Sequence, residues 1–457
     1  TANLRKRQNY SKEIITSKFQ YIVIDEAHNL ESKVRSSYTM EVSYTSLRRT
    51  IEQTTKLVRS VGNTIDKKIK QYYRYLDVVF ENLNSQVKKQ NELAKQKDRE
   101  IERYYVDTNI DALRELKNCV HDIYLEASMQ LGIDNDYRSR NYDVELEELE
   151  LQEEFWESML KKESDDIFWL TIKGEGKKNI ILASCPKNVN KLTEQLYFND
   201  PGFSTILTSA TITSGVAEEY EEGYKYFIQN TNFPAKKGII SEPKISPFDY
   251  NDHAMIYYTD DMPHPTKYRK QFIEKGIDEI VRLLNISEGK ALILFTAKSD
   301  LQFVYDELCA RTLPYKVIRP MAGASQTDTL NEFRAEKNAV LLGTGAFWEG
   351  INLAGDALTN VIIFRLPFPV PDPIIDAKTS KSKDGLMEVL VPEMIVKLKQ
   401  GLIRTENDKG IISILDPRLS ETYQMRYRDV VFSALPIKNR TSKIIELEEF
   451  YNHTVGE

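Results

Sequence analysis

The 457-residue sequence predicts an α/β protein with two parallel-sheet domains and a helical domain inserted into the first. Three observations predict this class. All 16 prolines lie at Pro186 or later, so the first part of the chain can form long helices. Between Leu47 and Val87 apolar residues recur at steps of three, four or seven, which is the period of a helix. Elsewhere short apolar runs alternate with amphipathic stretches, as in a parallel sheet covered by helices on both faces.

The order of these segments gives the expected elements and domains. Buried strands are expected at 21–24, 204–207, 291–295, 339–342, 361–364 and 411–415. Helices are expected at about 268–284, 299–308 and 328–333, and a helical stretch at about 107–130 should fold back on the Leu47–Val87 helix as an antiparallel hairpin. The expected domains are 1–40 with 171–250 for the first α/β domain, 41–170 for the insertion and 251–457 for the second α/β domain.

The net charge of −7 is unusual for a nucleic-acid-binding protein, whose footprint is usually basic. The acidity is concentrated between Asp143 and Leu170, where 11 Asp and Glu face 2 Lys and Arg; this local −9 leaves about +2 for the rest of the chain. We interpret the segment as a solvated helix face. Mimicry of a nucleic acid strand that guards a groove is the alternative.

Cysteine content and hydropathy exclude several classes of protein. Cys119, Cys185 and Cys309 are too far apart for a disulfide framework or a zinc knuckle, and three thiols are too few for an iron–sulfur site with four cysteine ligands in this chain. The apolar runs are far shorter than a bilayer span, and no apolar signal core follows the N-terminus. We therefore expect a cytoplasmic protein without membrane partners.

Two adjacent acids, Asp25 and Glu26, end the first apolar strand and precede Ala27 and His28. In open parallel sheets ligands bind beyond the carboxyl ends of the strands. In a phosphate-loop motor an acid at this place helps to hold Mg²⁺, and the adjacent acid can polarise the attacking water. The same pair could simply begin a helix, whose N-terminus favours negative charge.

Hydroxyl-bearing residues end two further strands. Ser209 and Thr211 follow the strand at 204–207, and Thr296, Lys298 and Ser299 follow the strand at 291–295. Alone, each could be an ordinary strand end.

A glycine-rich segment follows the strand at 339–342. It runs from Gly343 through Gly345, Glu349 and Gly350 to Asn352. Its glycines would let the backbone approach a phosphate closely, although such a segment could equally be only a turn.

Four segments in this order resemble the DinG/XPD helicases of superfamily 2. They are Asp25–His28, Ser209–Thr211, the Phe-Trp-Glu-Gly block ending at Gly350, and Gln400-Gly401-Leu402-Ile403-Arg404. The resemblance covers most of the chain. That family has two RecA-like motor domains and a helical arch inserted between the first two segments, where residues 41–170 lie here.

The resemblance implies an ATP-dependent DNA helicase that moves in the 5′ to 3′ direction, with ATP and Mg²⁺ as cofactors. By this similarity Asp25 would bind Mg²⁺, Glu26 would be the catalytic base, and His28 with Ser209 and Thr211 would couple nucleotide state to DNA binding.

The same resemblance assigns the remaining candidates and the partners. Gln400 and Arg404 would approach the phosphates, with Arg404 as an arginine finger. The nucleotide-binding set would include Glu349, Gly350 and Asn352, and the DNA-binding set Thr296, Lys298 and Ser299. The implied partners are single-stranded and duplex DNA, bound by a monomer.

Two features depart from the family. No Gly-x-x-x-x-Gly-Lys-Ser/Thr loop occurs in the 457 residues, and the nearest imitation, Gly174 to Lys178, is predicted to be a hairpin turn between 169–172 and 179–182. Because the family's loop lies N-terminal to the two acids, we expect the chain to begin inside the first motor domain. The family motif Gln-x-x-Gly-Arg-x-x-Arg is also shortened here, to Gln400 through Arg404 with one arginine.

Three functions therefore stay open. The chain could be the motor of an ATP-dependent DNA helicase. It could be a nucleic-acid-binding module that kept the fold but lost hydrolysis, or the helicase-like half of a DinG-type protein whose main activity is an N-terminal 3′–5′ exonuclease.

Overall fold

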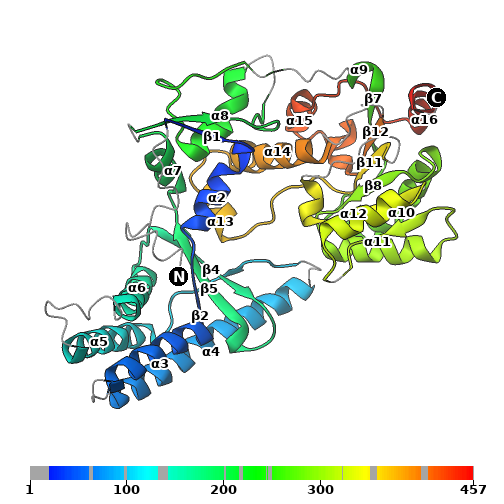
Figure 1. Cartoon of the computed structure of the whole chain (residues 1–457). Coiled ribbons are helices and arrows are strands. Elements are labelled where there is room, and N and C mark those ends of the chain that lie inside the picture. The colour runs from blue at the N-terminus through cyan, green and yellow to red at the C-terminus, as the bar shows by residue number, and fades with distance from the viewer. Residues whose placement is uncertain are drawn as a thin grey trace. The chain divides into compact units, whose positions relative to one another are not determined.

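The structure is a computed structural model that describes residues 20–60, 65–96, 100–131, 143–199, 202–215, 220–242, 244, 250–321, 323–349, 358–402 and 410–455. The chain forms two compact units, whose elements are labelled in Figure 1. Unit 1 comprises Thr1–Ile22, Asn29–Thr205 and Val370–Ser380, and unit 2 comprises Val23–His28, Ile206–Pro369 and Lys381–Glu457.

Unit 1 combines helices with a four-stranded antiparallel sheet of strand order β2-β5-β4-β3. Its strands are β2 (Met40–Ser43), β3 (Tyr104–Tyr105), β4 (Asp166–Ile172) and β5 (Ile180–Pro186). Its helices are α2 (Leu30–Ser37), α3 (Tyr44–Ser60), α4 (Asp66–Gln96), α5 (Leu113–Leu131), α6 (Asp143–Leu160), α7 (Val189–Tyr197) and α13 (Pro373–Thr379), with the short η3 (Lys177–Asn179).

The helical period predicted the long helices of unit 1 correctly. The run from Leu47 to Val87 is helical as α3 and α4, on both sides of residues 61–64, which lie outside the described residues. Helix α5 runs antiparallel to α4, because Lys68 pairs with Glu126 at 3.1 Å while Gln86 donates to the carbonyl of Asp107. The predicted antiparallel hairpin is therefore confirmed, and α3 to α6 share one apolar core.

The acidic segment is held in part by polar contacts within unit 1. Helix α6 buries Leu149, Phe155 and Trp156 in the core, and its carboxylates reach neighbouring helices. Glu148 accepts a hydrogen bond from Thr50, and Glu153 pairs with Lys117 at 2.9 Å. The helix thus joins α3 and α5 through its acids as well as presenting acids to solvent.

The predicted hairpin turn at Gly174–Lys178 is confirmed. Strands β4 and β5 are antiparallel, with Ile172 opposite Ile180. Gly176 has a φ of 86°, in the left-handed region that a residue without a Cβ adopts without strain. The segment is therefore a turn of the antiparallel sheet, not a phosphate-binding loop.

Unit 2 is built on a seven-stranded sheet of order β13-β7-β12-β11-β8-β10-β9, in which all recorded strand pairs are parallel. Its strands are β7 (Ala254–Tyr258), β8 (Ala291–Leu294), β9 (Lys316–Ile318), β10 (Ala339–Gly343), β11 (Asn360–Ile363), β12 (Gly410–Ile414) and β13 (Arg440–Thr441). Its helices are α8 (Tyr220–Thr231), α9 (Tyr250–His253), α10 (Arg269–Ile286), α11 (Lys298–Ala310), α12 (Gln326–Ala335), α14 (Val391–Leu402), α15 (Arg428–Ala434) and α16 (Ile444–Thr454). Short helical turns are η4 (Gly345–Trp348), η6 (Leu386–Leu390), η7 (Pro417–Leu419) and η8 (Glu421–Tyr423).

Both faces of this sheet are covered, as the near-continuous apolar strands predicted. In β8, Leu292 and Leu294 belong to one apolar cluster with α14, while Ala291 and Ile293 belong to another with α10 and α11. The α/β fold class is confirmed.

The prediction of buried strands is wrong for β1 (Tyr21–Ile24) and β6 (Ser204–Leu207). These strands form a two-stranded sheet, and Tyr21 and Val23 are 65% and 63% exposed. Tyr21 and Val23 share one face of this sheet because strand side chains alternate, and within the described residues that face is largely left uncovered. None of the described helices combines the length and apolar character needed to cross a bilayer.

Candidate functional site

The two acids lie where strand β1 ends, on a turn that folds onto β6. Thr208 N donates to the carbonyl of Ile24 and Ala27 N donates to the carbonyl of Thr208, both at 2.9 Å. This exchange fixes Asp25 and Glu26 between two hydrogen-bonded positions. Glu26 has a φ of 49°, a left-handed conformation that costs a non-glycine residue on the order of 1 kcal/mol or more. Such strain clusters at functional sites, and the Glu26 side chain is 61% exposed here.

His28 joins the two acids to the Ser209–Thr211 segment. Its Nδ1 lies 2.7 Å from Ser209 Oγ, 3.2 Å from Thr211 Oγ1 and 3.2 Å from Glu26 Oε2. Thr208 Oγ1 donates to Asp25 Oδ1 at 3.2 Å. The structure therefore brings together the residues that the sequence predicted at the ends of β1 and β6.

The other ring nitrogen of His28 faces α14. Its Nε2 is hydrogen-bonded to Nε2 of Gln400. Because an amide nitrogen can only donate, Nε2 of His28 is the acceptor and Nδ1 carries the proton. Nδ1–H can then donate to Ser209, whose hydroxyl donates onward to Glu26 at 3.5 Å.

Burial keeps this imidazole neutral. Burial lowers the pKa of His28 below its ordinary value, against the opposing attraction of Glu26, Glu349 and Asp25. A neutral ring has one donor and one acceptor, which is what a relay from Gln400 through His28 to Ser209 requires.

Helix α14 is held against the segment after Ser209–Thr211 by a buried lysine. Lys399, only 8% exposed, donates to the carbonyl and the hydroxyl of Thr213 at 2.9 and 3.1 Å. Two residues later in the same helix, a Cβ on Gly401 would lie 3.1 Å from the ring of Trp348, so a glycine suits this close packing. Lys399 and Gly401 thereby fix the rotation of α14 that points Gln400 at His28.

The glycine-rich segment after β10 is only partly described. Trp348 is buried and its Nε1 donates to the carbonyl of Phe295 at 2.9 Å, which anchors the turn η4. Glu349 follows this turn, and its charge acts on His28. Gly350, Asn352 and Arg404 lie outside the described residues.

The candidates after β8 lie at the start of α11. Lys298 begins that helix, and Ser299 accepts a hydrogen bond from Arg269 at 3.4 Å. Asp300, 1% exposed, pairs with Arg269 at 2.7 Å and with Arg365 at 3.0 Å. Thr296 precedes the helix, at the carboxyl end of the strand.

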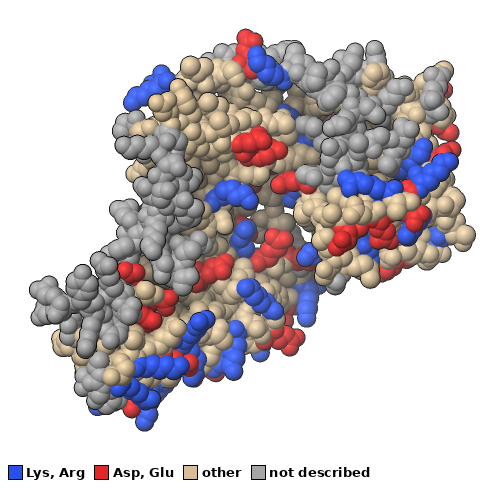
Figure 2. All heavy atoms as spheres, in the orientation of Figure 1, with Lys and Arg blue, Asp and Glu red and all other residues tan. Residues whose placement is uncertain are grey.

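Sequence reasoning missed one feature of the site and one separate feature of unit 1. Lys399 lies four residues after buried Ile395 and three before buried Leu402, so its place on the apolar stripe of α14 was the available signal. The feature of unit 1 is a set of exposed basic side chains on α3 and α4, and Figure 2 draws the Lys and Arg side chains of the visible face in blue. It comprises Arg49, Lys56, Arg59, Lys67, Lys70, Arg74, Lys88, Lys89 and Lys95.

Magnesium fits the acids in a limited sense. Among the described residues no group of three or more His, Cys, Asp or Glu side chains could hold a metal ion. Proteins usually hold Mg²⁺ with one or two carboxylates together with substrate phosphates, so a dedicated cage is not required. Asp25, with Thr208 beside it, offers this kind of partial ligand set.

Comparison with known proteins supports the resemblance. A helicase C-terminal domain model matches residues 280–436. The 3′–5′ exonuclease DinG of Bacillus subtilis is 30% identical over 60% of this chain and 30% of its own length. The ATP-dependent DNA helicase YoaA of Escherichia coli is 27% identical over 60% of this chain and 42% of its own length. The ATP-dependent DNA helicase DinG of Photobacterium profundum is 25% identical over 91% of this chain and 63% of its own length.

Solved structures support the fold. An XPD helicase and the Xpd4 protein of S. tokodaii each superpose with a TM-score of 0.51 at 18% identity, covering 93% of this chain and 69% and 78% of theirs. The α/β fold with RecA-like motor domains is therefore confirmed. The sequence matches show that the chain is similar to DinG- and YoaA-type helicases, and the solved structures show that it shares the fold of XPD helicases. The chain spans less than two thirds of the length of the relatives above.

Proposed function

We propose that this chain carries the motor of an ATP-dependent DNA helicase of the DinG/XPD type, which couples ATP hydrolysis to translocation on single-stranded DNA and to unwinding of a duplex. One observation carries the proposal. A single neutral imidazole, His28, is hydrogen-bonded at one nitrogen to Ser209 and at the other to Gln400. A change at the acids is therefore transmitted to two elements that are distant in sequence.

The residues of the site have distinct roles in this proposal. Asp25 holds Mg²⁺, and Glu26 takes the proton of the attacking water. Mg-ATP supplies the phosphoryl group whose transfer to water drives the motor. Ser209 and Thr211 orient His28, and Gln400 fixes its tautomer.

The remaining roles rest on resemblance. Glu349, Gly350 and Asn352 belong to the nucleotide-binding set, and Arg404 is the arginine finger. Thr296, Lys298 and Ser299 contact the DNA backbone, and the basic side chains of α3 and α4 give the insertion an electrostatic attraction for DNA. The protein acts as a cytoplasmic monomer without an iron–sulfur cluster in this chain.

A second candidate is a nucleic-acid-binding module without ATP hydrolysis, or the helicase-like half of an exonuclease. Two sequence features favour it: the 457 residues contain no Gly-x-x-x-x-Gly-Lys-Ser/Thr loop, and the Gln400–Arg404 motif is short. One relative is named a 3′–5′ exonuclease.

The substitution Glu26→Gln in the protein expressed from the complete gene separates these functions. The amide keeps the shape of the side chain but cannot accept a proton, so DNA-stimulated ATP hydrolysis should fall by about 10²- to 10⁴-fold. ATP binding, measured by titration calorimetry with Mg²⁺, should be largely kept because Asp25 is intact. Hydrolysis at the wild-type rate in the variant would show that Glu26 is not the base. An inert wild-type protein that still binds DNA would favour the second candidate.

A further inference from the structure

Helix α13 belongs to unit 1 although the chain on both sides of it belongs to unit 2. Val370–Ser380 is the part of unit 1 that follows Thr205 in the sequence. In the order of the chain, α13 comes after β11 and before α14, which both belong to unit 2. In Figure 1 it is the helix labelled α13 beside α2. Its contacts within unit 1 explain this assignment.

One face of α13 docks on the antiparallel sheet through apolar contacts. Ile374, 8% exposed, packs in a cluster with Ile167 and Trp169 of β4 and Ala183 and Cys185 of β5. Removing this apolar side chain from water stabilises the docked helix. The helix is therefore a packed part of this unit and not a loosely attached loop.

Three polar contacts surround this apolar contact. Asp372, which also caps α13 by accepting from Ile374 N and Ile375 N, pairs with Arg103. Tyr105 donates to Asp376 at 2.6 Å. At the far end of the helix Lys378 pairs with Glu31 of α2 at 3.1 Å.

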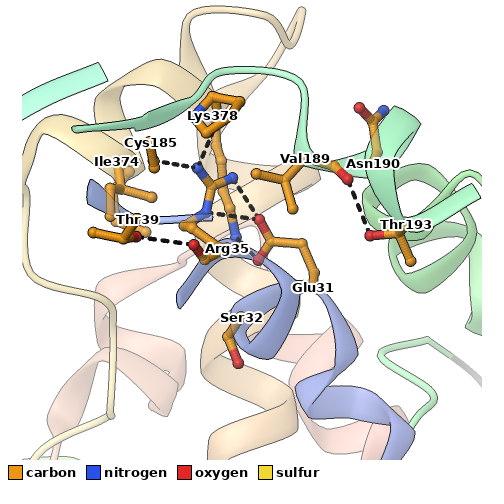
Figure 3. Close-up of polar contacts among 12 residues, drawn as sticks. Glu31, Ser32, Arg35, Thr39, Cys185, Val189, Asn190, Thr193, Ile374 and Lys378 are labelled. Atoms are coloured by element: carbon orange, nitrogen blue, oxygen red, sulfur yellow. Dashed lines mark hydrogen bonds and ion pairs between the residues drawn. The ribbon is translucent and has the colours of Figure 1, made fainter. Parts of the chain in front are cut away.

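Glu31 is a junction between three chain segments, as Figure 3 shows. Besides Lys378 of α13 it binds Arg35 of α2, and Arg35 donates to Cys185 Sγ at 3.1 Å and to the carbonyl of Pro186 in β5 at 3.3 Å. Burial alone would raise the pKa of Glu31, but Lys378 and Arg35 bring that pKa below its ordinary value. The carboxylate is therefore charged at neutral pH and holds both cations, six residues after Asp25.

The links between α13 and unit 2 are stiff or short. Prolines alternate at Pro367, Pro369, Pro371 and Pro373, a spacing that favours an extended and semi-rigid chain. On the other side three residues separate Ser380 from Asp384, which is fixed in unit 2 by Arg426 at 2.8 Å. Four residues of extended chain span at most about 14 Å. A displacement of the unit 2 chain is therefore passed to α13 instead of being absorbed by slack.

We propose that α13 is a tether that couples the helical insertion to the motor, with Lys378 and Glu31 as positioning residues at its junction with α2. This inference rests on the proposed function. During the ATPase cycle, movement of the unit 2 chain on either side of α13 pulls on α13. Helix α13 then passes the displacement to the β4–β5 sheet and to α2, the helix that follows Asp25–His28.

The docking is tested first in the 457-residue chain, with the double variant Tyr105→Phe/Lys378→Met. Both changes keep side-chain size nearly constant, leave the Asp372 cap intact, and leave Glu31 paired with Arg35. Amide hydrogen exchange across α13 should speed up by about tenfold or more, because exchange reports local opening. The matched control Tyr268→Phe/Lys383→Met changes the same residue types at exposed positions and should leave exchange in α13 unaltered. If the amides of α13 exchange at the wild-type rate in the test variant, the contacts of Tyr105 and Lys378 do not hold α13 on unit 1 and the proposal is overturned.

The coupling is tested in the protein expressed from the complete gene. In the test variant DNA-stimulated ATP hydrolysis should stay within about twofold of wild type, while the rate of duplex unwinding falls by about tenfold, an effect of the size seen for residues that carry coupling. The control variant should keep both rates. A parallel fall of both rates, or no change in either, overturns the tether while the proposed function stands. A wild-type protein that neither hydrolyses ATP nor unwinds DNA overturns both.

Discussion

Lys399 is a charged side chain held among apolar residues by two hydrogen bonds to Thr213. Burial, and secondarily the charge of Lys438, lower the pKa of Lys399 to about 8 from the ordinary 10.5. The protein tolerates this penalty one residue before Gln400, which faces His28. We interpret Lys399 as the residue that keeps α14 in register with the Ser209–Thr211 segment.

This pKa predicts a pH-dependent stability. Between about pH 8 and 10.5 the unfolded chain binds a proton that folded Lys399 has lost, so the free energy of unfolding rises with pH in this window. Between about pH 7.5 and about pH 9.5, the free energy of unfolding of the wild type should rise by about 2 kcal/mol relative to that of Lys399→Met. Urea unfolding of both proteins across this range measures it. A constant difference would mean that Lys399 titrates normally and is not buried as a cation.

At the scale of single elements, Gly343 shows a glycine selected by packing. A Cβ at this position would lie 2.5 Å from Cβ and 2.8 Å from Cγ of Phe347, a residue within the η4 turn. The sequence suggested that this glycine admits a phosphate. The structure gives it a steric reason within the protein, which does not depend on a ligand.

The substitution Gly343→Ala should therefore displace η4 and lower the free energy of unfolding by about 1–3 kcal/mol, as overpacking does. At Gly345 nothing lies within 4 Å and φ is 57°, so Gly345→Ala carries only the left-handed strain of about 1–2 kcal/mol. Denaturant unfolding of the two variants measures both losses of stability, and so compares the cost of overpacking at Gly343 with the cost of backbone strain at Gly345. An unchanged free energy of unfolding in Gly343→Ala would contradict this prediction, because the close contact with Phe347 would then have relaxed without cost.

The elements divide into those that local pattern predicts and those that it does not. Helical period identified α4 and α5, and continuous apolar runs identified β8 and β10, because these signals are local in sequence. The exposure of β1 and β6 depends on which elements pack against the faces of their sheet. The attachment of α13 to unit 1 depends on contacts with Glu31 and Trp169, which are more than 200 residues away in sequence. No period in the sequence carries either fact.

The candidate site divides in the same way. The order of the acidic and hydroxyl segments predicted residues that the structure brings within hydrogen-bonding distance, namely Glu26, His28 and Ser209. Their chemical roles stay predictions. The burial of Lys399 could have been read from its helical position, whereas its partner Thr213 could not, since that pairing joins α14 to a loop 186 residues earlier.

At the scale of the whole molecule, each unit has its own apolar core and the chain passes repeatedly from one unit to the other. The core of α3 to α6 lies in unit 1, and the two clusters on the faces of the seven-stranded sheet lie in unit 2. The chain changes unit after Ile22, His28, Thr205, Pro369 and Ser380. The Asp25–His28 segment sits between two of these crossings, so the chain on both sides of it belongs to unit 1.

The sequence of the whole chain also predicts whether the chain by itself can hydrolyse ATP. Phosphate-loop motors grip the β- and γ-phosphates mainly with a lysine and a nest of backbone amides at a helix N-terminus, and no segment of the 457 residues has the sequence of such a loop. We therefore expect this chain, by itself, to show no ATP hydrolysis above background with or without single-stranded DNA. A coupled phosphate-release assay, run in parallel with the Glu26→Gln variant, measures it. Turnover of about one per minute that Glu26→Gln abolishes would contradict the expectation, since it is slow beside typical enzymes yet assignable to this site. Turnover that survives Glu26→Gln but is lost on further purification would come from a contaminant, whereas turnover that survives both would contradict the expectation and the assignment of Glu26 as the base.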